Sequence, residues 1–156
     1  MPKAFRLYPP HAPGDPLSGE GARLYGGRWN RPGTAIVYTS EHLSLAVLEV
    51  LVNNVNREKL RDYHFLELEF DAKLIVSIKD PLPKGWLDYP APGASQDAGT
   101  HWAEALISAV LAVPSAIVPI ERNYILNPRH PDFKRIKVSG PFPFAFDARL
   151  KSVKGS

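Results

Sequence analysis

Short runs of apolar residues, separated by prolines and glycines, recur along the whole chain. Residues 4–8 (AFRLY) and 35–39 (AIVYT) are rich in β-branched and aromatic side chains and therefore predict strands. Residues 64–70 (HFLELEF) alternate apolar and polar positions, the period of a half-buried strand, and residues 74–78 predict another strand. Prolines and glycines punctuate residues 9–27, where we expect a long loop of the kind that often has a functional role.

A helix is predicted by the apolar run from Leu43 to Val55, with Ser40 and Glu41 in front of it as a capping segment. When successive residues are spaced by about 100°, Glu49 lies on a narrow polar stripe of this helix. The same stripe holds His42, Asn53 and Asn56. Leucines and valines cover the rest of the circumference, so we expect a central helix whose polar stripe faces either water or a cleft.

The second half of the chain predicts one helix and several short strands. Residues 97–110 place Trp102, Leu106 and Val110 at helical spacing and predict the helix. The predicted strands are residues 116–120 (AIVPI), 124–126 and 135–138, with a last edge strand at residues 142–146. This order of elements favours an α+β fold, in which a mixed, mostly antiparallel sheet packs against a few helices.

Composition excludes several classes of protein. The 156 residues suit a single domain, residues 1–156, and 44% hydrophobic with 22% charged residues is ordinary for a globular protein. The absence of cysteine excludes a disulfide framework, a thiolate zinc site, an iron–sulfur cluster and a cysteine nucleophile. The five histidines are far apart in sequence, and we expect no metal. No stretch approaches the roughly 18 apolar residues that cross a bilayer, so we expect a soluble, cytoplasmic protein without membrane contact.

The charge balance gives a weak indication of a partner. A net charge of +3 and a sequence pI near 9.2 slightly favour an anionic ligand, such as a nucleotide, a nucleic acid or an acidic protein. Trp29, Trp86 and Tyr89 would suit nucleic-acid binding. The lysines and arginines do not gather in one stripe, however, and no nucleic-acid-binding motif is present, so direct nucleic-acid binding is the less favoured alternative.

The segment Gly26-Gly27-Arg28-Trp29-Asn30 carries the clearest candidate chemistry. Two glycines let the backbone approach a ligand closely, Arg28 offers a forked cation, and Trp29 offers a flat apolar face. These groups would suit the phosphate of a nucleotide. A turn in which Arg28 stacks on a neighbouring aromatic ring explains the same residues equally well.

Taken one at a time, four further residues have ordinary structural explanations. Tyr38 fits a packed strand residue and Glu49 a solvated helix face. Ser115 fits a serine at the start of a strand, and Asn123 fits a turn. Together with the glycine segment, they give the chain a resemblance to the RES domain, a family named for an arginine, a glutamate and a serine. The matching segments are GGRWN (26–30), IVYTS (36–40), Leu48-Glu49, VPSAIVP (113–119) and ERNYILNPRHPDF (121–133). They occur in the order of the family and span residues 5–146, and GGRWN and NYILNP rarely occur together elsewhere.

The resemblance implies a fold like the catalytic domain of ADP-ribosyltransferases such as diphtheria toxin. It also implies the toxin of a bacterial toxin–antitoxin pair that depletes NAD, its substrate, as an NAD glycohydrolase without a metal. Transfer of ADP-ribose to a protein is the alternative, and a nucleic-acid-directed toxin is less favoured. The expected partner is an Xre-type DNA-binding antitoxin that blocks the active site. We expect residues 9–27 and 80–92 to form the rims of that site.

The resemblance further implies roles for single residues. The catalytic set would be Arg28, Tyr38, Glu49 and Ser115: Arg28 would clamp the pyrophosphate, and Tyr38 would stack beside the nicotinamide. Glu49 would stabilise the positive charge that develops on the ribose, and Ser115 would bind the ribose or position Glu49. Arg6 would be a second nucleotide ligand, or equally a partner in a structural ion pair. The expected substrate-binding residues are Arg6, Gly27, Arg28, Trp29, Asn30, Tyr38, Ser115 and Asn123.

Overall fold

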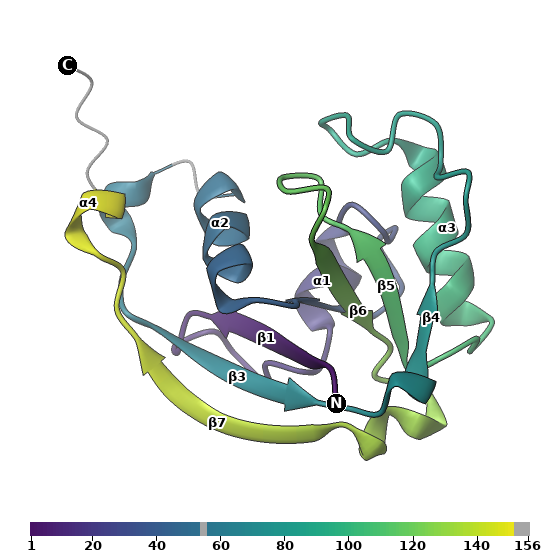
Figure 1. Ribbon diagram of the computed structural model, residues 1–156. Coiled ribbons are helices and arrows are strands. Elements are labelled where there is room, and N and C mark those ends of the chain that lie inside the picture. The colour runs from purple at the N-terminus through teal and green to yellow at the C-terminus, as the bar shows by residue number, and fades with distance from the viewer. Residues whose placement is uncertain (54–55, 152–156) are drawn as a thin grey trace.

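A mixed seven-stranded sheet forms the centre of the fold (Figure 1). The computed structural model describes residues 1–53 and 56–151. The strands follow the order β4-β5-β6-β2-β1-β3-β7, and every pairing is antiparallel except the parallel pair β4–β5. The strands are β1 (Lys3–Tyr8), β2 (Val37–Ser40), β3 (Tyr63–Glu69), β4 (Ile75–Ser77), β5 (Val110–Pro114), β6 (Arg122–Leu126) and β7 (Lys137–Phe144).

Two helices cover one face of this sheet. Figure 1 shows α2 over β1, α3 beside β4 and β5, and the hairpin of β5 and β6 between the two helices. The helices are α1 (Glu20–Tyr25), α2 (Leu43–Asn53), α3 (Gly93–Glu104) and α4 (Ala148–Lys151), and 3-10 turns cover Arg57–Lys59, Ala72–Leu74 and Pro131–Arg135. Each described helix is too short or too polar to span a lipid bilayer.

The alternation of side chains in β2 and β6 decides which residues face the helices. Val37 packs in the core cluster on one face of the sheet, whereas Tyr38 packs with the cluster that contains the α3 residue Trp102. Ser40 lies two residues after Tyr38 and therefore on the same face. In β6, Asn123 pairs directly with Ser40, which places it on that face as well.

The predicted α+β fold with a mostly antiparallel sheet is confirmed, but several predicted boundaries are wrong. The helix expected at residues 97–110 is α3, which ends at Glu104, and Val110 begins β5. The strand expected at residues 116–120 is the turn between β5 and β6, and its Ile120 is 94% exposed. Branched apolar residues suggested a strand there, but Glu121 N–H donates to the Val118 carbonyl at 2.8 Å and closes a turn.

The remaining differences are a short helix within a predicted loop, the merging of two predicted strands and the ends of one helix. The expected loop at residues 9–27 contains α1, and the two strands expected near the C-terminus form the single strand β7. Ser40 ends β2 instead of belonging to the start of the helix, which begins at Leu43. Val55, the expected end of that helix, lies outside the described residues.

Candidate functional site

Helix α2 places the carboxylate of Glu49 against the ends of β5 and β6. Ser115 Oγ donates to Glu49 Oε1 at 3.2 Å, and Asn123 Nδ2 donates to the same oxygen at 3.0 Å. These partners are 66 and 74 positions away along the chain. The polar stripe of the helix therefore faces polar residues of the sheet at the position of Glu49. The Glu49 side chain is half-buried there.

Ser115 is fully buried and has little freedom in its own hydrogen bonds. Its Oγ accepts the backbone N–H groups of Ile117 and Val118, both at 3.1 Å, which uses its two lone pairs. The hydroxyl proton is then directed to Glu49. Of the two roles expected for Ser115, binding ribose or positioning Glu49, this geometry favours positioning.

Asn123 is itself fixed by a residue that the sequence analysis assigned to a helix cap. Ser40 Oγ donates to Asn123 Oδ1 at 3.0 Å, and Ser40 is 3% exposed. The amide of Asn123 therefore bridges Ser40 and Glu49. Only the register between β2 and β6 brings these residues together, so the family-matching segment 36–40 contains Ser40 but does not by itself reveal its contact with Asn123.

The glycine segment forms a second group around Tyr38. The Tyr38 hydroxyl accepts the Trp29 backbone N–H at 3.0 Å and donates to Asn30 Oδ1 at 2.7 Å. Burial raises the pKa of Tyr38 well above its usual 10, so the hydroxyl keeps its proton at neutral pH. A Cβ added at Gly27 would lie 2.5 Å from this hydroxyl, so the close approach of the loop to Tyr38 requires glycine.

Trp29 and Asn30 do not present their side chains to a ligand, and this part of the prediction is wrong. Trp29 is 1% exposed and packs in the core with Ile36 and Trp102. Asn30 is fully buried, and its Nδ2 donates to three backbone carbonyls, the shortest bond being 2.8 Å to Ala22. The indole is packed in the core and the amide already has its hydrogen-bond partners, so both side chains hold the loop in shape.

Arg28 lies against the proline-rich segment at residues 80–92. Its Nη1 donates to the carbonyl of Trp86 at 2.7 Å and to that of Asp88 at 2.9 Å. Within residues 1–53 and 56–151, neither Nε nor Nη2 has a hydrogen-bond partner. One edge of the guanidinium thus keeps two parallel donors for a bidentate anion.

Arg6 lies on the other face of the sheet, contrary to its expected role as a nucleotide ligand. It shares a face of β1 with Ala4 and Tyr8, whereas Leu7 packs in the cluster that contains α2. Its Nε donates to the Pro16 carbonyl at 3.2 Å and its Nη1 to the Tyr38 carbonyl at 3.4 Å. Burial lowers the pKa of Arg6, and its contacts are to carbonyls instead of to an acidic partner.

The two groups adjoin on the helix-covered face of the sheet. Tyr38 belongs to the Arg28 loop group and Ser40 to the Glu49 group, and the two residues are separated by about 7 Å along β2. A forked cation and a carboxylate on one sheet face can bind different parts of one ligand that has an anionic group and hydroxyl groups. The two groups contain the segments GGRWN and Leu48-Glu49, on which the resemblance to the RES domain was based.

Comparison with known proteins decides the family. The RES domain family matches residues 3–147. The chain belongs to the RES domain family. Arg28, Glu49 and Ser115, which the resemblance matches to the arginine, glutamate and serine of the family's name, lie in the loop, helix and strand end described above.

The alignments of this RES domain with its named relatives cover nearly the full length of each relative. "Toxin Res" of Photorhabdus laumondii is 43% identical over 140 residues, which are 88% of this chain and 89% of the relative. "Toxin Res" of Yersinia enterocolitica is 41% identical over 136 residues, 86% of this chain and 90% of the relative. The "Prs ADP-ribosylating toxin" of a Sphingobium species is 39% identical over 140 residues, 87% of each chain.

A solved structure confirms the fold of this RES domain. A chain in the crystal structure of the M. tuberculosis MbcT–MbcA toxin–antitoxin complex has a TM-score of 0.72. The likeness covers 91% of this chain and 83% of that chain, at 19% sequence identity. At that identity, the likeness concerns the fold.

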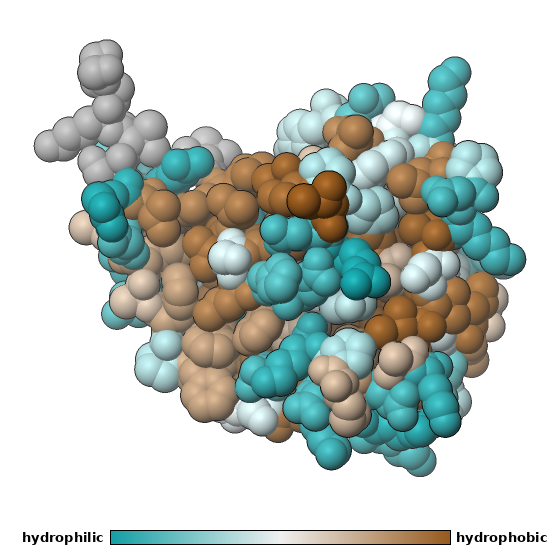
Figure 2. Space-filling model, in the orientation of Figure 1, coloured by the Kyte–Doolittle hydropathy of each residue, from teal (hydrophilic) through white to brown (hydrophobic). Residues whose placement is uncertain are grey.

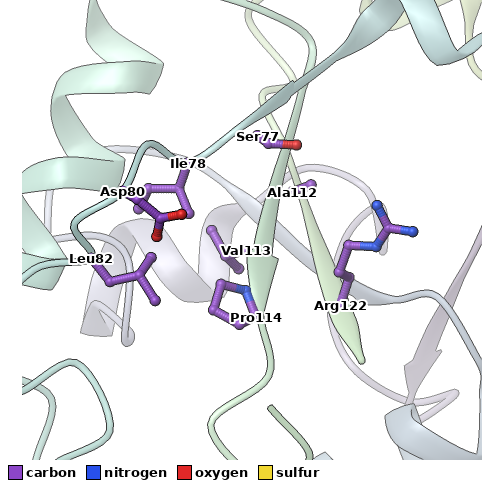
Figure 3. A pocket seen from close by; sticks show the side chains of 8 residues that line it. All are labelled: Ser77, Ile78, Asp80, Leu82, Ala112, Val113, Pro114 and Arg122. Carbon is purple, nitrogen blue, oxygen red and sulfur yellow. The ribbon is translucent and has the colours of Figure 1, made fainter. Parts of the chain in front are cut away.

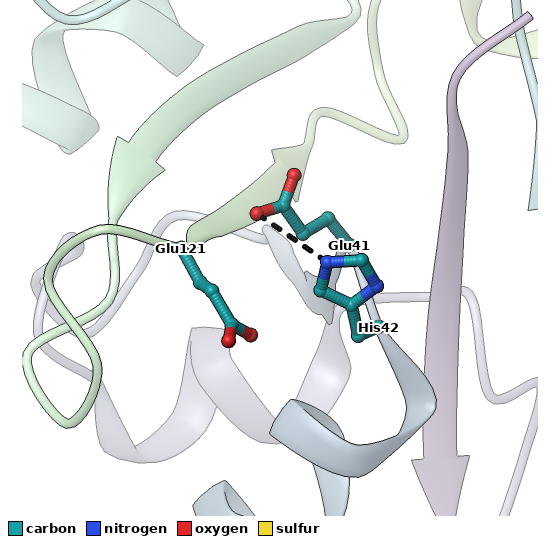
Figure 4. A group of neighbouring side chains, drawn as sticks. All are labelled: Glu41, His42 and Glu121. Carbon is teal, nitrogen blue, oxygen red and sulfur yellow. Dashed lines mark ion pairs between the residues drawn. The ribbon is translucent and has the colours of Figure 1, made fainter.

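One group of side chains near the site could offer ligands to a metal. Glu41, His42 and Glu121 each bring one ligand atom within 4.8 Å of the others (Figure 4). Glu41 Oε1 already accepts the Arg122 backbone N–H at 2.8 Å, and the Arg122 guanidinium lies 3.5 Å from the other oxygen. Because a cation already neutralises Glu41, the group is a poor metal site.

Two cavities lie outside the Arg28 and Glu49 groups. The first, of about 270 Å³, is shown in Figure 3. Its walls include Asp80, Val113, Pro114 and Arg122, so it adjoins the strand ends that carry Ser115 and Asn123. The second, of about 320 Å³, is lined by Thr34, Ala35, Ala103, Glu104, Leu106, Asn127 and Arg129. Neither cavity includes Arg28 or Glu49 in its lining.

Proposed function

We propose that this RES domain is the toxin of a toxin–antitoxin system and that it hydrolyses NAD at the bond between nicotinamide and ribose. The observation that carries the proposal is the hydrogen bonding of the two carboxylate oxygens of Glu49. Two donors hold its Oε1, and no described residue donates to Oε2. One carboxylate oxygen is thus kept for a substrate, on the sheet face where Arg28 offers a free fork.

The chemistry of NAD cleavage suits these two groups. When the bond between the ribose anomeric carbon and the nicotinamide nitrogen breaks, its electron pair leaves with nicotinamide and the ribose becomes positively charged. Glu49 Oε2 would accept a hydrogen bond from a ribose hydroxyl, and its charge would stabilise the sugar cation. The Nε–Nη2 edge of Arg28 would bind the pyrophosphate. Water then adds to the anomeric carbon and releases a proton, giving ADP-ribose.

Transfer of ADP-ribose to a protein is the second candidate. The name of the Sphingobium relative, an ADP-ribosylating toxin at 39% identity, favours it. The same Arg28 and Glu49 would hold NAD in both reactions. The two functions differ only in whether water or a side chain of another protein reaches the anomeric carbon.

The partner that we propose is an Xre-type DNA-binding antitoxin that blocks this site. Apolar side chains gather over α2 and the tip of the β5–β6 hairpin, as Figure 2 shows in the orientation of Figure 1. Leu48, Val52 and Ile120 there are 40%, 62% and 94% exposed. Glu49 lies between α2 and the β5–β6 hairpin, where it bonds to Ser115 and Asn123, so a protein that spans both apolar ends would also cover the carboxylate. The complex that contains the structural relative supports an antitoxin of some kind.

Glu49→Gln provides the test of the carboxylate. The Gln oxygen can accept the bonds from Ser115 and Asn123, so its amide nitrogen replaces Oε2 and presents a donor instead of a charged acceptor. We expect the free energy of unfolding to change by less than about 0.5 kcal/mol. The rate of NAD cleavage should fall about 100-fold or more. Glu67→Gln is the matched control and should keep the wild-type rate. It removes a carboxylate of β3 that pairs with Lys3 of β1.

The assay follows nicotinamide and ADP-ribose by chromatography after purified chain is mixed with NAD. Release of both products without any protein acceptor supports hydrolysis. Nicotinamide release that requires a protein acceptor, with radiolabelled adenosine attached to that protein, would establish transfer. Wild-type protein that folds and leaves NAD intact under both conditions would refute an NAD-cleaving function. An unchanged rate in Glu49→Gln would remove Glu49 from the reaction.

A further inference from the structure

The anchor of Glu49 is a pair of residues on two central strands. Ser40 and Asn123 are directly opposed in the antiparallel pair β2–β6, with β1 on the far side of β2 and β5 on the far side of β6. Ser40 is buried and Asn123 is half-buried. Strands in the middle of a sheet are the most rigid part of such a fold, so this pair is a fixed reference point for a side chain that reaches it.

The chemistry of the three groups fixes which atom of Asn123 faces which neighbour. An ionised carboxylate can only accept hydrogen bonds, so Glu49 selects the Nδ2 end of the amide. The Oδ1 end then faces Ser40, whose hydroxyl donates to it at 3.0 Å. With the amide turned around, Oδ1 would oppose the carboxylate and Nδ2 would oppose the serine, and Glu49 would lose a donor.

This fixed amide matters because Glu49 is long and only partly buried. Three rotatable bonds separate its carboxylate from the helix backbone, and α2 itself holds none of the donors to Oε1. Ser115 supplies one donor from the β5 end, and Asn123 supplies the second from β6. Two donors from different directions define the position and the rotation of the carboxylate, whereas one donor would leave it free to swing.

We infer that Ser40 and Asn123 are positioning residues, which hold Glu49 through Oε1 so that Oε2 meets the ribose hydroxyl. The inference rests on the proposed NAD cleavage. It replaces the expectation that Asn123 contacts the substrate itself. A positioning residue lowers the turnover number kcat and leaves the KM for NAD nearly unchanged, because it acts on the reacting carboxylate and not on the bound dinucleotide.

The test measures initial rates of nicotinamide release against NAD concentration for the full chain and four variants. Asn123→Asp keeps the shape but puts a negative charge beside Glu49, and we expect kcat to fall about 100-fold, the size of an ångström-scale misplacement. Ser40→Ala leaves the amide free to rotate, and a loss of about 5- to 10-fold in kcat is expected. Ser40→Thr restores the hydroxyl and should recover kcat to within about 2-fold of wild type.

Thr39→Val is the matched control. Thr39 neighbours Ser40 on β2, is equally buried at 3% exposure, and its hydroxyl donates to the Tyr124 carbonyl at 2.6 Å. It faces the opposite side of the sheet, so its removal destabilises the same strand pair without touching Glu49. We expect a lower free energy of unfolding in this variant with an unchanged kcat.

The outcomes separate this inference from the proposed function. Wild-type protein that cleaves no NAD refutes the function, and the positioning role with it. Active wild-type protein with unchanged kcat in Asn123→Asp and Ser40→Ala refutes the positioning role alone, as does a raised KM with normal kcat, which would make Asn123 a substrate contact. A loss in Thr39→Val as large as in Ser40→Ala would also refute it. Should Asn123→Asp fail to fold, the comparison of Ser40→Ala with Ser40→Thr decides.

Discussion

Gly27→Ala should be the most damaging small change in the loop that carries Arg28. The new Cβ would lie 2.5 Å from the Tyr38 hydroxyl oxygen, 2.8 Å from Cζ and 2.9 Å from Cε2, where ordinary contacts are 3.4–4 Å. The Tyr38 ring or the loop must therefore move by about 1 Å, which in a packed site costs about 1–3 kcal/mol. The movement also breaks hydrogen bonds to Trp29 N–H and to the buried Asn30 Oδ1.

Adding the loss of a buried hydrogen bond, about 1–3 kcal/mol, gives an expected total decrease of about 2–6 kcal/mol in the free energy of unfolding. That is a large share of the about 5–15 kcal/mol typical of a domain. Urea unfolding followed by tryptophan fluorescence measures it. Gly21→Ala in α1 is the control, because a Cβ there meets nothing within 4 Å. It should be neutral or stabilise the protein by up to about 1 kcal/mol.

A double-mutant cycle with Tyr38→Phe tests the reason for the cost. Removing the hydroxyl deletes the nearest atom and the two hydrogen bonds that Gly27→Ala would break. The double variant should therefore lose at least about 1 kcal/mol less than the sum of the single variants. Losses that add to within about 0.5 kcal/mol would refute the argument, since they would show that the two changes act on separate parts of the structure.

Three further outcomes are expected. Gly99→Ala places a Cβ 1.8 Å from the Trp29 carbonyl oxygen, so it should abolish folding or lower the free energy of unfolding by more than about 4 kcal/mol, measurable by urea unfolding. Arg28→Lys can still contact the carbonyls of the neighbouring segment but has no second edge, so the KM for NAD should rise about 10-fold or more; an unchanged KM would show that Arg28 is structural. Arg149 lowers the pKa of Asp147 from 3.8 to about 2, so the stabilising effect of this pair is complete above pH 3.8 and is lost as the pH falls through 2. Carbon-13 NMR of the Asp147 carboxyl should show its pKa returning toward 3.8 in Arg149→Gln.

Residue patterns sufficed for the elements whose period reflects local burial. The alternation of β3 and the apolar run of α2 predicted a strand and a helix at nearly the observed places. The turn at residues 116–120 was mistaken for a strand because its branched apolar residues have strand character. There, the hydroxyl of Ser115 binds the backbone N–H groups of Ile117 and Val118 and bends the chain. The composition of the segment does not show that side-chain hydrogen bonds to the backbone compete there with strand formation.

The resemblance identified the acidic and basic candidates of the site, whereas the sequence did not reveal the residues that hold them. The family resemblance pointed to Arg28, Glu49 and Ser115, and the fold places Glu49 and Ser115 in contact. The burial of Trp29 and the bridge from Ser40 through Asn123 depend on packing and strand register, which arise only when distant segments meet. Tryptophan next to arginine suggested a ligand platform because the sequence does not show which way a side chain points.

The wide separation of Glu49 from its donors has a consequence for the order of synthesis. Ribosomes deliver Glu49 first and its partners Ser115 and Asn123 only 66 and 74 residues later. Strand β6 must then insert between β2 and β5 before those partners reach the carboxylate. A nascent chain that ends before residue 115 has the glutamate without either donor. The hydrogen-bonded arrangement around Glu49 is therefore assembled late, which leaves an interval during translation in which the chain is present but this group of residues is incomplete.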